Sequence, residues 1–179
     1  MAVTAYVALL RGINVGGHAK VAMAELRATF VDMGFTDATT YIQSGNVVFT
    51  ASGSATRARS VIEKGLETRF GLGITVVVRT RPQLSEIIGH NPLAGGGRDP
   101  AKLHVTFLAA APTSSRLSTL DPDGFLPDEF RVAGAEVYVH CPNGYGRTKL
   151  NNAFFERSLG VAATTRTLRT VTTLADMGG

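Results

Sequence analysis

The order in which strands and helices are predicted repeats once along the chain, and this order constrains the fold more than any other feature. In the first repeat, a nearly continuous apolar run at residues 3–10 is typical of a strand buried on both faces. A helix follows because apolar residues recur at helical spacing from Met23 to Met33, before Gly34. The remaining predicted elements are strands over 39–43 and 46–50 joined as a hairpin, a helix over 61–70 and a strand over 74–78.

The second repeat has the same order. Its predicted elements are strands over 103–109, 130–133, 136–140 and 163–168, helices over 113–120 and 148–159, and a terminal helical turn over 171–177. Strand, helix, strand, strand, helix, strand is the βαββαβ order of a ferredoxin-like unit. We therefore predict an α+β protein with two ferredoxin-like βαββαβ halves in tandem. The halves cover residues 1–80 and 102–179, and a connecting helix opened by Pro82 and a Gly-rich linker fill 81–101.

Composition narrows the function classes only weakly. The net charge is +4, with 14 Arg against 4 Lys. Arginine suits phosphate because its planar fork contacts two oxygens, although a codon bias toward Arg, Ala and Gly gives the same composition. The single cysteine excludes an internal disulfide, and no His or Cys spacing predicts a metal site. No apolar run approaches the roughly 18 residues of a membrane span. We expect a cytoplasmic protein without cofactor, metal or membrane partner; the oligomeric state stays open.

A Gly-rich loop at 141–149 lies between the predicted strand 136–140 and the helix that follows it. Such a loop can aim several backbone N–H groups at one point, where the positive end of the helix adds to the field. Arg147 and Lys149 fall in the predicted first helical turn, where cations oppose the helix dipole. A bound anion would relieve this, and so would exposure to water. We predict that Tyr145, Arg147 and Lys149 contact an anionic ligand; the alternative is a tight turn.

A second Gly-rich loop, at 11–18, lies between the first predicted strand and helix and is bordered by Arg11 and Lys20. It has neither the Walker A spacing nor the dinucleotide-binding spacing. The hairpin junction at 43–46 adds amide and hydroxyl groups, which also suit a plain turn. We predict that these loops converge on one cleft near the junction of the halves. The predicted ligand-binding residues are Arg11, Asn14, Gly16, Gly17, Gln43, Ser44, Asn46, Tyr145, Arg147 and Lys149.

Aromatic and histidine residues offer alternatives that we weigh less. Tyr6 and Phe49 fall on central strands, where an RNA-binding sheet places stacking rings, but we expect them in the core because the wider aromatic pattern is missing. His104 and His140 alternate with other polar residues, which we interpret as a half-exposed sheet face. No nucleophile and base can be paired from the sequence, so catalytic residues stay unassigned.

Three motifs resemble a known family. They are Gly-Ile-Asn-Val-Gly-Gly at 12–17, Tyr-Ile-Gln-Ser-Gly-Asn-Val-Val-Phe at 41–49 and Asn-Gly-Tyr-Gly-Arg-Thr-Lys at 143–149. In this order they resemble the bacterial family catalogued as domain of unknown function 1697. The resemblance implies a cytoplasmic α+β protein with ferredoxin-like pieces and no assigned activity. The family usually carries Thr-x-Arg-Asn-Trp near its C-terminus, whereas Thr167 and Leu168 replace the Asn and Trp here.

Three function classes follow from these observations. The first is a module that binds a phosphorylated small molecule or nucleotide through the two Gly-rich loops. The second is a nucleic-acid-binding protein, which needs its cations spread along a track rather than focused in a pocket. The third is an enzyme acting on a phosphate-bearing substrate, and a purely structural role in binding a partner completes the set.

Overall fold

The chain forms two compact units. The computed structural model describes residues 2–177. The first unit comprises the chain up to Ser85 and from Thr173 onward, and the second comprises Glu86–Thr172. Each unit contains one four-stranded sheet in which all pairs are antiparallel. The finer division into 1–80, 81–101 and 102–179 stays a prediction, because only the folding of the separated pieces would test it.

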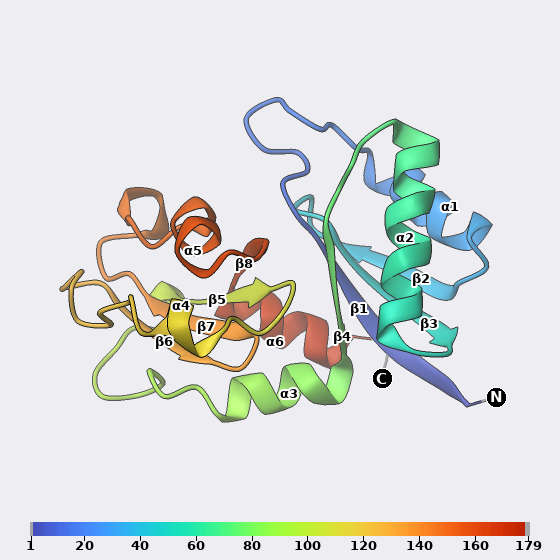
Figure 1. Ribbon diagram of the computed structural model, residues 1–179. Coiled ribbons are helices and arrows are strands. Elements are labelled where there is room, and N and C mark those ends of the chain that lie inside the picture. The colour runs from blue at the N-terminus through green and yellow to red at the C-terminus, as the bar shows by residue number, and fades with distance from the viewer. Residues whose placement is uncertain (1, 178–179) are drawn as a thin grey trace. The chain divides into compact units, whose positions relative to one another are not determined.

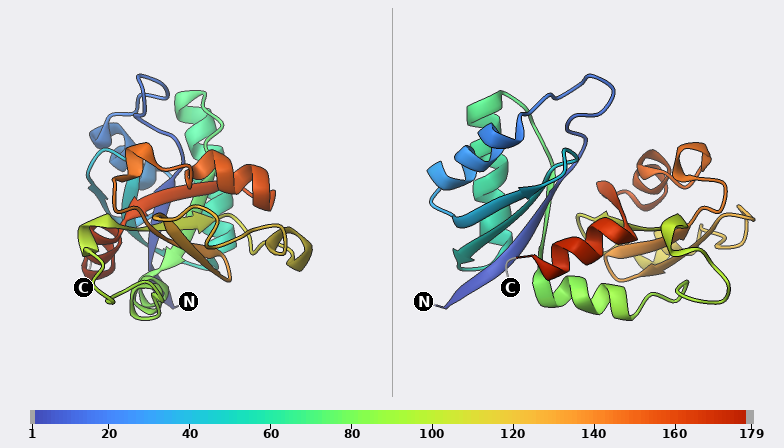
Figure 2. Two further views of the ribbon diagram at one scale, coloured as in Figure 1. Left: turned by 90° about the vertical axis from the view of Figure 1, so that its left-hand side faces the viewer. Right: turned by 180° about the vertical axis from the view of Figure 1, so that it is seen from behind.

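The first unit has the predicted ferredoxin-like order. Its elements are β1 (Val3–Leu10), α1 (Met23–Asp32), β2 (Thr36–Tyr41), β3 (Asn46–Ser52), α2 (Ala55–Phe70) and β4 (Val76–Thr80). The sheet order is β2-β3-β1-β4, which places β1 and β3 in the centre. Both helices lie on one face of the sheet (Figures 1 and 2). The βαββαβ prediction is confirmed for this half.

The second unit repeats the arrangement with shorter helices. Its elements are β5 (Leu103–Leu108), α4 (Ser114–Leu117), β6 (Glu129–Ala133), β7 (Glu136–His140), α5 (Asn152–Leu159) and β8 (Ala163–Thr167). The sheet order β6-β7-β5-β8 is equivalent to that of the first unit. Two further helices are α3 (Arg81–Gly89), which carries the predicted Pro82, and α6 (Leu168–Asp176) at the predicted terminal turn; short 3-10 turns are η1 (Pro100–Lys102) and η2 (Tyr145–Arg147). Two ferredoxin-like halves in tandem are confirmed.

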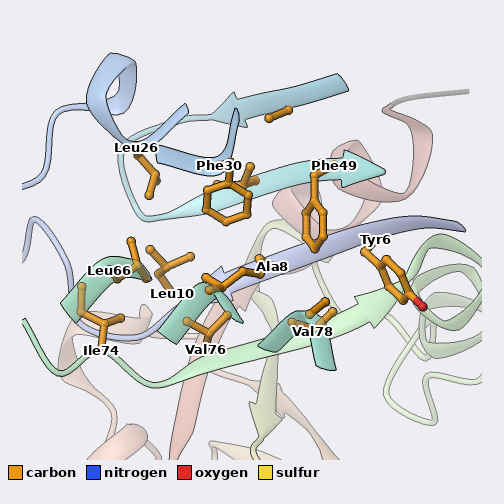
Figure 3. Packing of buried hydrophobic residues seen from close by; sticks show 14 of the residues in the cluster. Tyr6, Ala8, Leu10, Leu26, Phe30, Phe49, Leu66, Ile74, Val76 and Val78 are labelled. Carbon is orange, nitrogen blue, oxygen red and sulfur yellow. The ribbon is translucent and has the colours of Figure 1, made fainter. Parts of the chain in front are cut away.

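Aromatic rings fill the space between the first sheet and its helices (Figure 3). Tyr6 and Phe49 are paired across β1 and β3, with ring centroids 5.7 Å apart. Phe30 of α1 meets Phe49 edge-on at 5.3 Å. The Tyr6 hydroxyl donates to the Gly53 carbonyl at 2.7 Å, so its polar end is satisfied. Tyr6 and Phe49 are core residues, as expected, and their buried rings present no stacking surface to a nucleic acid.

The second sheet buries polar residues that the sequence interpretation placed at half exposure. His104 and His140 are each only 8% exposed. Thr106 is fully buried and shares a 2.7 Å hydrogen bond with Thr165 of the neighbouring strand. The interpretation of a half-exposed face is therefore wrong. Alternation along a strand shows which residues share a face, but the elements that cover the face decide its burial.

Candidate functional site

Asn14 ties the first Gly-rich loop to the β2–β3 turn. Its Nδ2 donates to the carbonyl oxygens of Val21, at 3.0 Å, and Gln43, at 2.9 Å. Its Oδ1 accepts from the Val21 N–H at 2.8 Å. One amide within the loop thus bonds to Val21, just before α1, and to a turn 29 residues away. The loop, which Figure 1 shows extending beyond the end of the sheet between β1 and α1, is held in one place at its base.

Gly45 lets the turn approach the base of this loop closely. The Leu10 N–H donates to the Gly45 carbonyl at 2.8 Å. Gly45 has φ +89, and a Cβ added there would lie 2.8 Å from Ile13 Cδ1 and 2.9 Å from Leu10 Cβ. Both the backbone conformation and the lack of space therefore require glycine here.

Other predicted residues of the first unit stabilise the turn and the loop. Asn46 is fully buried, and its Nδ2 donates to the Tyr41 carbonyl at 2.9 Å and to Ser44 Oγ at 2.8 Å. The Arg11 backbone N–H donates to the Thr75 carbonyl at 3.0 Å. These contacts explain why amide and hydroxyl residues occupy the hairpin junction.

Backbone strain concentrates in this assembly. Asn14, Ala19 and Ile42 have φ values of +55, +50 and +47, and they are three of the four described non-glycine residues with positive φ. The conformation is most costly for Ile42, because its side chain is β-branched. The Ile42 side chain is nevertheless half exposed, so core packing does not impose the conformation. Strain of this kind is typical of ligand-binding sites.

An open pocket of about 550 Å³ lies beside the Asn14 bridge. It is lined by Asn14, Gly17, Lys20, Val21, Ala22, Glu25 and Gln43. Asn14, Gly17 and Gln43 were predicted as site residues, whereas Arg11, Gly16, Ser44 and Asn46 are not among its lining residues. Lys20 was noticed as a border cation only, and Glu25 was missed. The one sequence signal that could have identified Glu25 as a site residue is its position in the first turn of a predicted helix.

The pocket includes the N-terminus of α1. Ala22 is the N-cap residue, and its side chain accepts no hydrogen bond from the first turn. The first N–H groups of a helix have no acceptor within the helix, and together they act as a partial positive charge. Lys20 is exposed two residues before this cap. Positive charge therefore reaches the pocket from two sources, the Lys20 side chain and the start of α1, and the Glu25 carboxylate in the first turn of α1 opposes it.

The second Gly-rich loop is held by bonds to its own unit. The Cys141 N–H donates to the Lys102 carbonyl at 3.0 Å. Thr148 Oγ1 donates to Asp128 Oδ2 at 2.7 Å and accepts from the Leu150 N–H at 3.1 Å. Burial raises the pKa of the Cys141 thiol, which favours its protonated form over a nucleophilic thiolate. The cysteine is a packed residue of the second core.

Tyr145 closes this loop over a buried histidine. Its ring stacks on His104 with centroids 4.8 Å apart and planes 27° apart. Within the described part of the chain, neither Tyr145 Oη nor His104 Nδ1 has a hydrogen-bond partner, although both atoms are buried. Burial lowers the pKa of His104 and raises that of Tyr145. Both rings are thereby kept neutral near pH 7.

The predicted helix over 148–159 begins later than expected. α5 starts at Asn152, and Asn151 caps it by accepting from the Phe154 N–H at 3.0 Å. Arg147 instead ends η2, and the next residue, Thr148, is extended with ψ 149. Placing Arg147 and Lys149 in a first helical turn is therefore wrong. The Thr148 hydroxyl redirects the chain by accepting from the N–H two residues later.

The predicted site residues thus fall in both units. Asn14, Gly17 and Gln43 line the pocket of the first unit, and the exposed Arg147 and Lys149 belong to the second. Their convergence on one cleft stays a prediction.

Two features are absent from residues 2–177. No group of three His, Cys, Asp or Glu side chains in this part of the chain could hold a metal ion. None of the helices described there has the length and apolar character needed to cross a membrane.

The chain matches a known protein family. A family model described as "Protein of unknown function (DUF1697)" matches residues 3–138. The chain belongs to this family. The matched residues include the first Gly-rich loop and the 43–46 turn, and they end before the second loop. No curated protein matches the chain.

A solved structure has the same fold. It is that of SP0830, a conserved bacterial protein from Streptococcus pneumoniae. The two sequences are 24% identical, and the superposition has a TM-score of 0.78 over 98% of this chain and 99% of that one. At this identity, the likeness shows the fold alone.

Proposed function

We propose that the first unit binds a small phosphate-bearing molecule in the pocket lined by Lys20, Asn14 and Gln43. The observation that carries the proposal is a pocket of about 550 Å³ in which Lys20 and the uncapped start of α1 meet. Backbone N–H groups at a helix start donate to phosphate oxygens, and a lysine adds a full charge. Pockets of a few hundred Å³ suit compounds the size of a metabolite or mononucleotide.

The Asn14 bridge supports the proposal because it makes the pocket rigid before a ligand arrives. The Asn14 side chain makes three hydrogen bonds, two with the Val21 backbone and one to the Gln43 carbonyl of the turn. Preorganisation of this kind reduces the entropy that a ligand must offset on binding. The strained backbone at Ala19 and Ile42 lies in the same assembly, and such conformations cluster at ligand-binding sites.

Replacing Lys20 tests the proposal directly. Isothermal titration of inorganic phosphate and methyl phosphate at fixed ionic strength should give an affinity roughly tenfold lower for Lys20→Gln, a difference of about 1.4 kcal/mol. Lys64→Gln is the matched control, since Lys64 is an exposed lysine of α2 outside this pocket. Equal phosphate affinities for wild type and Lys20→Gln would overturn the proposal.

The nucleic-acid alternative predicts a different result. A basic track releases several counterions, so the affinity for a single-stranded oligonucleotide would fall steeply with salt. In a pocket for one phosphate group, the affinity falls only slightly as the salt concentration rises. The basic track would be favoured if an oligonucleotide bound tightly, if the slope of log affinity against log salt corresponded to several phosphate contacts, and if mononucleotides did not bind. An enzymatic role would require turnover of a bound phosphate compound.

A further inference from the structure

The pocket of the first unit carries both signs of charge. Lys20 lines it, and so does Glu25, the third residue of α1. Neither of these two takes part in a salt bridge within residues 2–177, so the lysine is not neutralised by the carboxylate. Both side chains are exposed to the solvent that fills the pocket. An occupant therefore meets one cation and one anion at the same time.

A carboxylate constrains what this pocket accepts. An ionised Glu only accepts hydrogen bonds, and it repels any phosphate oxygen placed beside it. It is satisfied when the ligand offers N–H or O–H donors. Gln43 adds a second acceptor, the oxygen of its side-chain amide. Gln43 is an exposed residue, and only its backbone carbonyl is bonded to Asn14. The Glu25 carboxylate and the oxygen of the Gln43 amide thus suit a ligand group rich in donors.

The volume points the same way. A space of about 550 Å³ is several times larger than an inorganic phosphate and lies in the range of sites for whole small molecules. Gly17 and Ala22 leave parts of the wall without side chains that would fill the space. A phosphate held by Lys20 would fill only a part of this volume. The remaining space can hold an organic group in the same pocket that Glu25 lines.

We infer that the ligand is a phosphate monoester whose organic part carries hydrogen-bond donors, either hydroxyl or amino groups, and that these donors bond to the Glu25 carboxylate. This inference rests on the proposed phosphate site at Lys20. Sugar phosphates and phosphorylated amino alcohols share the required chemistry: one dianionic end, and donors a few bonds away. The opposite charges of Lys20 and Glu25 then select the direction in which the ligand lies.

The test compares three probes on one protein. Methyl phosphate has no donor on its organic part, ribose 5-phosphate has hydroxyl donors, and O-phosphoethanolamine has an ammonium donor. Isothermal titration of the full chain at pH 7.5 and fixed ionic strength should show at least one donor-bearing probe binding tenfold or more tightly than methyl phosphate. The better of the two identifies the donor as hydroxyl or amine.

The Glu25→Gln variant isolates the carboxylate. It should reduce the advantage of the better probe at least fivefold and leave methyl phosphate binding unchanged or tighter, because a repelling charge has been removed. Asp32→Asn is the matched control: it makes the same charge change at the exposed far end of α1, away from the pocket. The Asp32→Asn variant should bind the better donor-bearing probe more tightly than methyl phosphate by the same factor as wild type does. Circular dichroism and the melting temperature of each variant verify that the fold is intact.

The two proposals fail in different ways. If all three probes bind wild type equally, or if Glu25→Gln keeps the donor advantage, the donor inference is overturned while the phosphate site survives through its dependence on Lys20. If Lys20→Gln binds every probe as wild type does, or if no probe binds wild type, the phosphate site and the inference both fall.

Discussion

The two Gly-rich loops contain the same kinds of residues, yet they begin their helices differently. The loop at 11–18 leads to α1, whose N-cap residue, Ala22, provides no hydrogen bond and borders a pocket. The loop at 141–149 ends before a separate N-cap, Asn151, which accepts from the first turn of α5. Glycines and nearby cations do not distinguish the two loops. The capping residue does, because it determines whether helix N–H groups are satisfied within the chain or left accessible to water and to any ligand.

The two loops are also held by different forces. Asn14 anchors the first loop through neutral hydrogen bonds to backbone carbonyl and N–H groups. The second loop is anchored by a ring stack of Tyr145 on the buried His104, together with the bond between Thr148 and Asp128. The first anchor is independent of pH near neutrality, whereas the second contains a titratable ring. The comparison therefore predicts different responses to mutation and to acid.

The largest effect is expected where the first loop meets the turn. Gly45→Ala combines a disfavoured positive φ with a clash against Leu10 and Ile13, and should lower the free energy of unfolding by roughly 3 kcal/mol. Gly71→Ala at the C-cap of α2 is the matched comparison, since Gly71 is in the left-handed helical conformation (φ 68, ψ 22) but nothing lies within 4 Å of an added Cβ. It should cost only about 1–2 kcal/mol. Urea denaturation followed by circular dichroism measures both, and equal losses would contradict the close approach at Gly45.

Acid should weaken the second unit through His104. Burial holds the pKa of this histidine below its ordinary 6.5, so the folded state stays neutral while the unfolded chain takes up a proton. Stability from this group is complete above pH 6.5 and falls as the pH drops toward the folded pKa. The slope is at most about 1.4 kcal/mol per pH unit. Urea titrations between pH 7 and 5 measure it.

His104→Phe keeps a ring for Tyr145 to stack on and should flatten this pH dependence. His90→Phe is the control, because His90 is an exposed histidine in the same unit and should leave the slope unchanged. The salt bridge from Arg98 lowers the pKa of Glu129, whose stabilising effect is lost only below its ordinary 4.5, outside the tested range. If the free energy of unfolding of His104→Phe falls with pH as steeply as that of wild type, another group causes the acid sensitivity.

The smallest effect is expected at Arg147. It ends a 3-10 turn, where no helix dipole adds to its charge, so Arg147→Ala should reduce phosphate affinity roughly threefold at most, less than Lys20→Gln. Arg131→Ala, at a half-exposed arginine of β6, is the control for removal of a positive charge from the second unit. Titration with phosphate at fixed ionic strength decides the ranking. A larger loss for Arg147→Ala than for Lys20→Gln would reverse the comparison and make the second loop the main anion site.

The sequence alone determined the element order and the fold class of this protein. Each strand and helix is marked by local features: the apolar run of β1, the helical spacing from Met23 to Met33, and the Gly and Asn residues of the turns. Such features act over a few residues and can be detected without knowing the fold. The ferredoxin-like order follows from them in both halves. The motifs at 12–17 and 41–49 also marked the segments that meet in the first unit.

Which polar residues line a pocket and which are structural depends on the three-dimensional packing of the chain. Asn14 contacts a carbonyl 29 residues away, and Gly45 is required by the side chains of Leu10 and Ile13. Asn46 and His104 are buried by elements that no local pattern identifies. These outcomes depend on contacts between distant segments, whose geometry is set by the packing of the whole unit. The start of α5 at Asn152 is decided locally instead, because the Thr148 hydroxyl and the Asn151 amide oxygen accept from N–H groups two and three residues later.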